Sequence, residues 1–562
     1  MKKIKKLICI SLVSLLTFSV TTTAFADEEH IFVKNKKQLT IASKATKKNP
    51  GVLLRKNVIP SETIVPKNII PESYNSVDLG YVTSIKNQKL HNTCWAFAAM
   101  STLESALLKH NFGSYDLSEE HLDAWATTRS DGSGWIRTLN DGTFPMAAMG
   151  YLASWQGAKL DIDIPYGYAT GKTFEEVDQK GKIEYGVTSI IMLPDNHNVI
   201  KTAIMDYGAV TASFSANDEF FTADGTGAFG YKEIETYEIE GHAISIVGWD
   251  DNYNKDKLKT IDGHTPSKNG AWLCKNSWGN YNELDGYFWI SYEDAYLFNE
   301  IMGSPYTIKD LIKIDDNTKM YQVEKYGATY DFNLSYDDNN SVNKMTFINK
   351  YNFTERYGNL ESVTFETTSV GADYTVYLIP IDDESGNPVE DEKEWTELSR
   401  GTVDYSGYIN SEVNSELPYD ECAIGVTIDG NSNNVSSSFG CDEWLDDGME
   451  TYYFIPDVQK DKSYLKLDST IYNLSDFYND YFNDNIGSNF VIKAITTADE
   501  NVKKCDVNND GQVSIVDAVL ALRQTLQLEK LSHNGMYSAD ANSDGNITVT
   551  DAVLIQRKIL GY

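Results

Sequence analysis

The chain has 562 residues and a formal net charge of −34 at pH 7. It is too long to fold around one hydrophobic core, so we expect two to four domains. The first 26 residues carry four lysines and no acidic residue, so the remaining chain carries −38. This balance excludes nucleic acid as an expected partner and favours solubility and cation binding.

The N-terminus predicts export. Lysines at positions 2, 3, 5 and 6 precede an apolar run over 7–20 and the small-residue site Ala24-Phe25-Ala26, which indicates a secretory signal over 1–26. The run is short for a membrane anchor, and we expect no membrane span elsewhere. Residues 27–70 are polar, rich in lysine and punctuated by proline. They form a leader, either a pro-segment over a cleft or a disordered arm.

Residues 71–305 predict an α+β domain. Apolar side chains at 97, 100, 103 and 107 share one face of a helix over 94–110. Residues 116–120 form an N-cap-like start to a second helix. Strands are expected over 209–214, 243–247, 270–275 and 286–290.

Residues 306–497 predict an all-β sandwich. Tyr, Asn, Asp and Ser dominate, and short alternating segments recur at 362–366, 374–378, 423–428 and 490–494. Cys422 and Cys441 are candidates for a disulfide, but the mature chain has too few cysteines for a disulfide framework.

Residues 498–562 hold a duplication, because the acidic loop 506–511 returns at 540–545 and an apolar helix follows each copy. Oxygen side chains on a tight, glycine-pivoted loop are the ligands that calcium prefers. The candidate ligands are Asp506, Asn508, Asp510, Gln512 and Asp517 in copy one, and Asp540, Asn542, Asp544, Asn546 and Asp551 in copy two. The segment therefore predicts a small α module holding two calcium ions.

Cys94 begins the first predicted helix, where the helix dipole favours its thiolate. Gln88 can aim its amide at the same place and, with the Cys94 N–H, hold an oxyanion. His242 opens an apolar strand behind a glycine and can serve as the base. Asn276 can orient the imidazole, and Trp278 can cover that bond from water.

These segments, in this order, resemble a papain-like cysteine peptidase. The matching pieces are Asn87-Gln88, Cys94-Trp95-Ala96-Phe97, Leu117-Ser118-Glu119, Gly241-His242-Ala243 and Lys275-Asn276-Ser277-Trp278-Gly279. The resemblance implies that Cys94 is the nucleophile, His242 the general base and then acid, and Asn276 its orienter. It also implies that Gln88 completes the oxyanion hole and that peptides are hydrolysed through a thioester without a cofactor.

Some positions depart from that family. His91 and Asn140 stand where the family usually has a disulfide. Gly142-Thr143 replaces the usual Gly-Gly clamp for extended substrate, with Phe144 behind it. Transfer of the acyl group to an amine instead of water stays open, because it would use the same nucleophile and base.

The C-terminal duplication resembles a type I dockerin, which implies a cohesin module of a scaffoldin as partner and a secreted, cellulosome-associated protein at the cell surface. The resemblance also implies that Ile515-Val516 and Val549-Thr550 help to select the cohesin. Residues 306–497 resemble the lectin-like domain that follows some bacterial papain-like peptidases. A glycan is one candidate ligand there, and a spacer role is the alternative.

The combined prediction is a multidomain, secreted cysteine endopeptidase with a papain-like domain, a β-sandwich and a calcium-binding dockerin. The alternative is a docked adhesin with a weak or vestigial peptidase domain. We expect Cys274 to lie in a core strand, and His121, His197 and His264 to lie on the surface or in loops.

Overall fold

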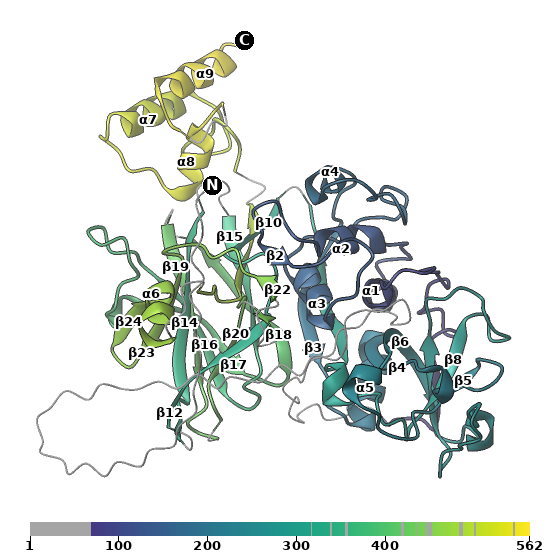
Figure 1. Ribbon diagram of the computed structural model, residues 1–562. Helices are drawn as coiled ribbons and strands as arrows, with labels where there is room; N and C mark the ends of the chain where they lie inside the picture. The colour runs from purple at the N-terminus through teal and green to yellow at the C-terminus, as the bar shows by residue number, and fades with distance from the viewer. Residues whose placement is uncertain are drawn as a thin grey trace, which may run out of the picture.

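The computed structural model (Figure 1) describes residues 69–315, 317–337, 340–353, 358–417, 421–433, 435–443, 445–446, 452–482, 487–498, 502–542 and 546–561. The predicted signal, nearly all of the leader and the candidate ligand Asp544 lie outside these residues. Within the described chain, no helix has both the length and the apolar character needed to cross a membrane.

Helix α1 (Cys94–Lys109) lies in the core of the N-terminal half, which the sequence predicts as an α+β domain. Every residue from 94 to 107 is buried, because α2, α3 and the strands β4, β6 and β9 all contact this helix. Its burial is therefore wider than the single apolar face that the sequence predicts. The other helices are α2 (Glu119–Trp125), α3 (Pro145–Ala153), α4 (Phe174–Asp178), α5 (His197–Tyr207), α6 (Leu474–Phe482), α7 (Ile515–Thr525), α8 (His533–Ala539) and α9 (Val549–Ile559).

One sheet of 12 strands runs through both the peptidase region and the sandwich. Its order is β10 (Thr318–Gln322), β25 (Ile492–Ala498), β15 (Gly358–Thr367), β18 (Ser406–Glu416), β3 (Tyr185–Met192), β9 (Tyr306–Lys313), β4 (Val210–Ser215), β6 (Gly241–Asp250), β7 (Ala271–Lys275), β8 (Tyr287–Ser291) and β5 (Gly227–Ala228), with β1 (Ser73–Asn75) beside β6. Strand β9, which begins directly after residue 305, lies between β3 and β4, and the remaining sandwich strands join this part of the sheet where β18 pairs with β3, Tyr408 opposite Ile190. Gly407 makes this approach possible, since a Cβ there would lie 2.2 Å from the Ile190 carbonyl oxygen.

The second sandwich sheet has six strands, β17 (Thr396–Thr402), β16 (Asp373–Ile379), β19 (Glu421–Asp429), β14 (Lys344–Asn352), β23 (Ser463–Leu467) and β24 (Thr470–Asn473). The small sheets are β11 (Tyr330–Asn333) with β20 (Ser438–Cys441), β12 (Ser335–Asp337) with β13 (Asn340–Ser341), and β2 (Gly134–Trp135) with β22 (Tyr452–Ile455) and β21 (Leu445–Asp446). The predicted sandwich is thus present. Cys422 and Cys441 are free, buried thiols, so the candidate disulfide is wrong.

A buried ion pair lies at the junction of the two halves. Lys493 in β25 and Glu324 both have fully buried side chains and form a salt bridge. Lys493 Nζ also donates to Ser154 Oγ of the peptidase half at 3.0 Å and to Gln322 Oε1 at 2.7 Å. Burial lowers the pKa of Lys493, while Glu324 opposes that shift.

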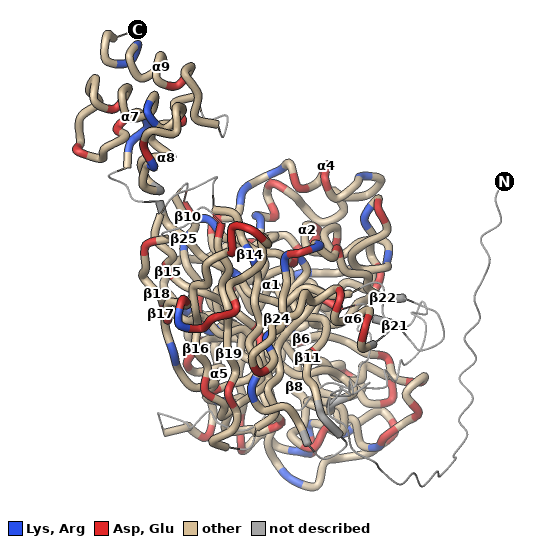
Figure 2. The backbone as a smooth tube through the Cα atoms, turned by 90° about the vertical axis from the view of Figure 1, so that its left-hand side faces the viewer, with Lys and Arg blue, Asp and Glu red and all other residues tan. Residues whose placement is uncertain are grey.

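Helices α7, α8 and α9 form a separate small body, which stands apart from the sheets in both views (Figures 1 and 2). Its buried residues make a cluster of their own. Ser514 and Thr548 each begin a helix with a capping box that uses Asp517 and Asp551. The duplicated loops of the sequence therefore correspond to duplicated helix starts.

Candidate active site

Cys94 is the first residue of α1 and is fully buried. The Ala243 N–H donates to its Sγ at 3.3 Å. The N-cap residue Thr93 makes no side-chain cap, and the first turn carries no acidic residue, so no carboxylate offsets the positive end of the helix dipole. Burial nevertheless raises the pKa of the Cys94 thiol to about 12. The backbone N–H groups of Ala243, Trp95 and Cys94 itself act in the opposite direction and lower this pKa.

His242 lies on β6, directly before the residue that contacts the thiol. Its Nε2 donates to Asn276 Oδ1 at 2.8 Å, and the Ser277 N–H donates to the same oxygen at 2.8 Å. Among the described residues Nδ1 has no hydrogen-bond partner. Trp278 stacks on the imidazole with ring centroids 4.7 Å apart. The histidine is therefore oriented through one nitrogen and keeps the other available.

Burial also lowers the pKa of His242 to about 4, while the hydrogen bond to Asn276 raises it. Either charge alone, thiolate or imidazolium, is thus disfavoured in this dry site. Transfer of the thiol proton to this imidazole would create both charges together, next to the helix N-terminus.

Gln88 lies beside the loop that carries Asn276. Its Oε1 accepts from Ser277 Oγ at 2.6 Å, and its Nε2 donates to the His91 carbonyl at 2.7 Å. The backbone N–H of Gln88 also donates to the Ser277 carbonyl at 2.8 Å. Two segments far apart in sequence are thereby brought to the same end of α1.

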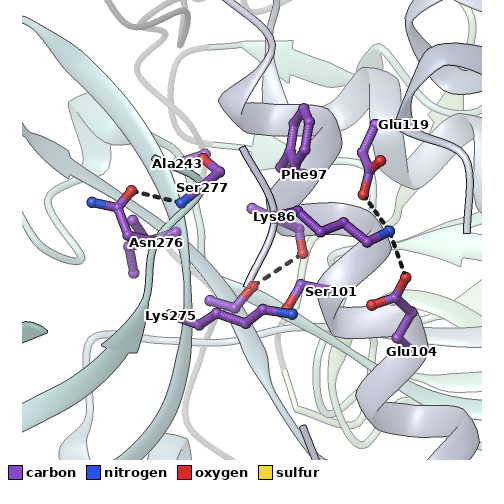
Figure 3. A pocket seen from close by; sticks show the side chains of 12 residues that line it. Lys86, Phe97, Ser101, Glu104, Glu119, Ala243, Lys275, Asn276 and Ser277 are labelled. Carbon is purple, nitrogen blue, oxygen red and sulfur yellow. Dashed lines mark hydrogen bonds and ion pairs between the residues drawn. The ribbon is translucent and has the colours of Figure 1, made fainter. Parts of the chain in front are cut away.

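A charge cluster behind the site, in which Glu104 and Glu119 are buried and Asp116 is exposed, was not foreseen from the sequence (Figure 3). Lys86 Nζ contacts Glu104 at 2.9 Å, Glu119 at 2.8 Å and Asp116 at 2.7 Å. Burial raises the pKa of Glu119 to about 7, whereas the surrounding carboxylates raise the pKa of Lys86 and keep it protonated. A charged residue within the apolar helix, Glu104, was the signal that could have revealed the cluster.

This cluster connects the catalytic segments to α1. Lys86 lies two residues before Gln88, and Lys275 lies directly before Asn276. Lys275 Nζ donates to Thr83 Oγ1 at 3.0 Å, and Thr83 in turn donates to Glu104. Both segments are therefore fixed to the helix that carries Cys94.

Two further expectations about single residues have clear outcomes. Cys274 is fully buried in β7, as predicted. His121 is not a surface residue, because it is fully buried in α2 and contacts Tyr151 OH at 2.6 Å and Asp178 at 3.1 Å. The expectation for it is wrong because the helix has neighbours on both sides.

The first acidic loop of the small body has buried carboxylates. Asp506 and Asp517 are 1% and 0% exposed. They accept backbone N–H groups, for example Asp506 Oδ2 from Gly511 at 2.9 Å and Asp517 Oδ1 from Val507 at 2.7 Å. Asp510 accepts from Gln512 N at 2.9 Å and from Asn508 Nδ2 at 2.9 Å.

In the second loop the Asn542 N–H donates to Asp551 Oδ1 at 3.2 Å. Asp540 Oδ2 lies 3.7 Å from Lys504 Nζ, and Asn546 is exposed. Across the described residues, no three His, Cys, Asp or Glu side chains converge as a complete metal cluster. The donor set nevertheless fits a hard cation, because it consists of oxygen atoms and includes buried carboxylates.

Comparison with known proteins assigns three regions. Residues 70–303 match the family described as papain family cysteine protease, 320–496 the lectin like domain, and 491–560 the dockerin type I domain. A type I dockerin domain is a calcium-binding module.

Curated relatives match over about two fifths of this chain. Cathepsin J of Rattus norvegicus is 25% identical over 213 residues, which are 38% of this chain and 58% of the rat protein. Cathepsin L2 of Homo sapiens is 23% identical over 40% of this chain and 61% of that protein. The chain thus spans about three fifths of the length of these relatives.

Two solved structures cover more of the chain. The clostridial cysteine protease Cwp84 after propeptide cleavage is 37% identical, with a TM-score of 0.67, over 76% of this chain and 99% of that one. The cysteine protease and lectin-like domains of Cwp84, a surface layer associated protein of Clostridium difficile, are 35% identical, with a TM-score of 0.68, over 83% and 100%. The chain therefore belongs to the papain family of cysteine proteases, and a lectin-like domain and a type I dockerin domain follow its protease domain.

Proposed function

We propose that this chain is a secreted cysteine endopeptidase that a calcium-dependent dockerin tethers to a scaffold. The observation that carries the catalytic part is the hydrogen bond of 2.8 Å from His242 Nε2 to Asn276 Oδ1. It leaves Nδ1 for the thiol of Cys94, which sits at the helix N-terminus. We further propose the division into 71–305, 306–497 and 498–562, with a signal over 1–26 and a leader over 27–70.

In the proposed reaction, Cys94 Sγ gives its proton to His242 Nδ1 and attacks the peptide carbonyl carbon. The Cys94 N–H and an N–H of Gln88 Nε2 stabilise the oxyanion. His242 then protonates the leaving amine, and a thioester remains. Water, deprotonated by the same imidazole, attacks the thioester and releases the acid. Asn276 keeps the imidazole oriented in both steps.

Hydrolysis of a fluorogenic peptide library under reducing conditions tests the proposal. The wild type should cleave, Cys94→Ala should not, and Cys422→Ala should cleave normally, since this buried thiol lies in a sandwich strand. Asn276→Ala should slow turnover less than Cys94→Ala does, because an orienting residue contributes less than the nucleophile. Equal losses would refute that division of roles.

A wild type that hydrolyses no peptide should be compared with a shorter chain in the same assay. A chain that starts at Pro71 lacks the leader, and activity of this chain alone would identify a latent zymogen. Silence of both chains would contradict the peptidase proposal and favour the adhesin. Adding an amine nucleophile to the assay and measuring amide product separates acyl transfer from hydrolysis.

For the dockerin we propose two calcium ions, one in each duplicated loop, and a cohesin module as partner. Support comes from the buried carboxylates of Asp506, Asp517 and Asp551 and from apolar side chains that the helix starts leave exposed. Ile515, Val516 and Val549 are 58%, 50% and 54% exposed. Calorimetric titration with a cohesin, with and without calcium, checks the partner, and equilibrium dialysis counts the ions. Glycan binding by the sandwich and residence at the cell surface through a cellulosome belong to the same proposal.

A further inference from the structure

The sandwich touches the protease domain at a second place, close to the nucleophile. Strand β22 of the sandwich pairs with β2 of the protease domain, Phe454 opposite Trp135. The Ile136 N–H donates to the Tyr453 carbonyl at 2.8 Å. Trp135 and Phe454 are 1% and 0% exposed, with ring centroids 5.1 Å apart. This contact is a packed core and not a surface touch.

The segment after β2 connects this core to the catalytic helix. The Asn92 N–H donates to the Asn140 carbonyl at 3.0 Å, and Trp95 Nε1 donates to the Asp141 carbonyl at 3.4 Å. Asn92 lies two residues before Cys94, and Trp95 directly follows it. Residues 140–144 therefore form a wall beside the start of α1, where Cys94 lies, and Gly142, Thr143 and Phe144 of this wall are buried.

The side chain of Tyr453, in the sandwich, packs against this wall. Tyr453 meets Phe144 edge to face, with ring centroids 5.7 Å apart and an interplanar angle of 86°. Phe144 is itself 1% exposed and precedes α3. We propose that Tyr453 of the sandwich is a positioning residue of the peptidase, which holds the wall at 140–144 in place for an extended peptide. The inference rests on the proposed function.

The test uses the full-length chain and three variants. Tyr453→Ala removes the ring, Tyr453→Phe keeps it, and Tyr472→Ala removes a partly buried ring elsewhere in the sandwich, where it packs on Phe477. The readouts are kcat and KM for a long peptide, the rate at which iodoacetamide alkylates Cys94, and the rate at which a peptidyl alkylating reagent does so. Iodoacetamide reports the nucleophile alone, because it is too small to use the wall.

Tyr453→Ala should raise KM about tenfold, since a small displacement of a positioning surface is costly, and should leave kcat and the iodoacetamide rate near the wild-type values. Tyr453→Phe and Tyr472→Ala should behave as the wild type. An unchanged KM, or an equal fall in the peptide and iodoacetamide rates, would overturn the inference. If Tyr453→Ala folds poorly, Tyr453→Leu fills the space without an aromatic edge and gives the same test.

The hydrolysis and alkylation measurements distinguish a failure of this inference from a failure of the proposed function. A wild type that does not hydrolyse peptides defeats the proposed function. The ratio of peptidyl reagent to iodoacetamide rates still decides the role of Tyr453, because alkylation requires no turnover. A ratio that Tyr453→Ala leaves unchanged would refute the positioning role whatever the hydrolysis assay gives.

Discussion

The two domains that follow the protease domain are joined to it in opposite ways. The sandwich shares a sheet with it through β18 and β3, shares apolar clusters with it, and buries the Lys493–Glu324 pair at the junction. Helices α7–α9 have a core of their own and stand apart in both views (Figures 1 and 2). The protease and sandwich therefore pack as one continuous body, whereas the dockerin has a core of its own.

Calcium removal should have the largest effect on stability, and it should destabilise only helices α7–α9. A chelator leaves the buried carboxylates of Asp506 and Asp517 without a cation, so α7–α9 should lose their whole unfolding transition. Calorimetry should show that the transition of the protease–sandwich body is unchanged. A shift of both transitions together would contradict the separation.

The replacement Lys493→Met should have the next largest effect on the free energy of unfolding. It leaves the Glu324 carboxylate buried and unpaired, which costs about 3–5 kcal/mol of the free energy of unfolding. Protease and sandwich should still unfold in one transition, measured in denaturant. The matched control is Lys344→Met, which removes the exposed pair with Asp429 and should cost at most about 1 kcal/mol. Two separate transitions in Lys493→Met would show that the halves fold independently.

A fall in pH should destabilise the protease–sandwich body through protonation of His242. The folded state holds the pKa of this imidazole at about 4, below its usual 6.5, so the unfolded chain binds the proton more tightly. The stabilisation is complete above pH 6.5 and is lost as pH falls toward 4, by about 2–3 kcal/mol. Denaturation of the wild type and His242→Gln across this range should differ in slope. Equal slopes would mean that the thiol already protonates the imidazole in the native state.

A reducing agent should have the smallest effect. All five cysteines in the described residues are free thiols, so the junction depends on packing and not on a covalent link. Dithiothreitol should leave the melting temperatures of both regions unchanged. A marked fall for the fused body would reveal a bridge, with Cys422 and Cys441 as the first pair to map.

The sequence predicted the elements of the fold better than the joins between them. Cys94 begins a helix and His242 stands near the start of a strand, as local patterns indicated. The pairing of β18 with β3 could not be read in this way, because Tyr408 and Ile190 are more than two hundred residues apart and neither segment encodes its partner. Long-range register is set by packing, which hydrophobic periodicity does not report.

The buried charges were missed for a related reason. Glu104 stands out as a charged residue within an apolar helix, but the sequence of the helix alone does not show which residues pair with it. Lys86 and Thr83 from the preceding segment and the Leu117 N–H from the following one offset the cost of burying it. In the acidic loops the chemistry is local, and the pattern at Asp506 and Asp517 was visible directly.

The first described strand sets a limit on how far the N-terminus can be trimmed. Strand β1 pairs with β6, Tyr74 opposite Trp249, and Trp249 Nε1 donates to the Pro71 carbonyl at 3.1 Å. Strand β6 is also the one that carries His242. A processing enzyme that stops before Pro71 leaves this pairing intact, whereas one that cuts beyond Asn75 removes a neighbour of the catalytic strand. Any N-terminal cut that preserves the support of β6 therefore has to fall before Pro71.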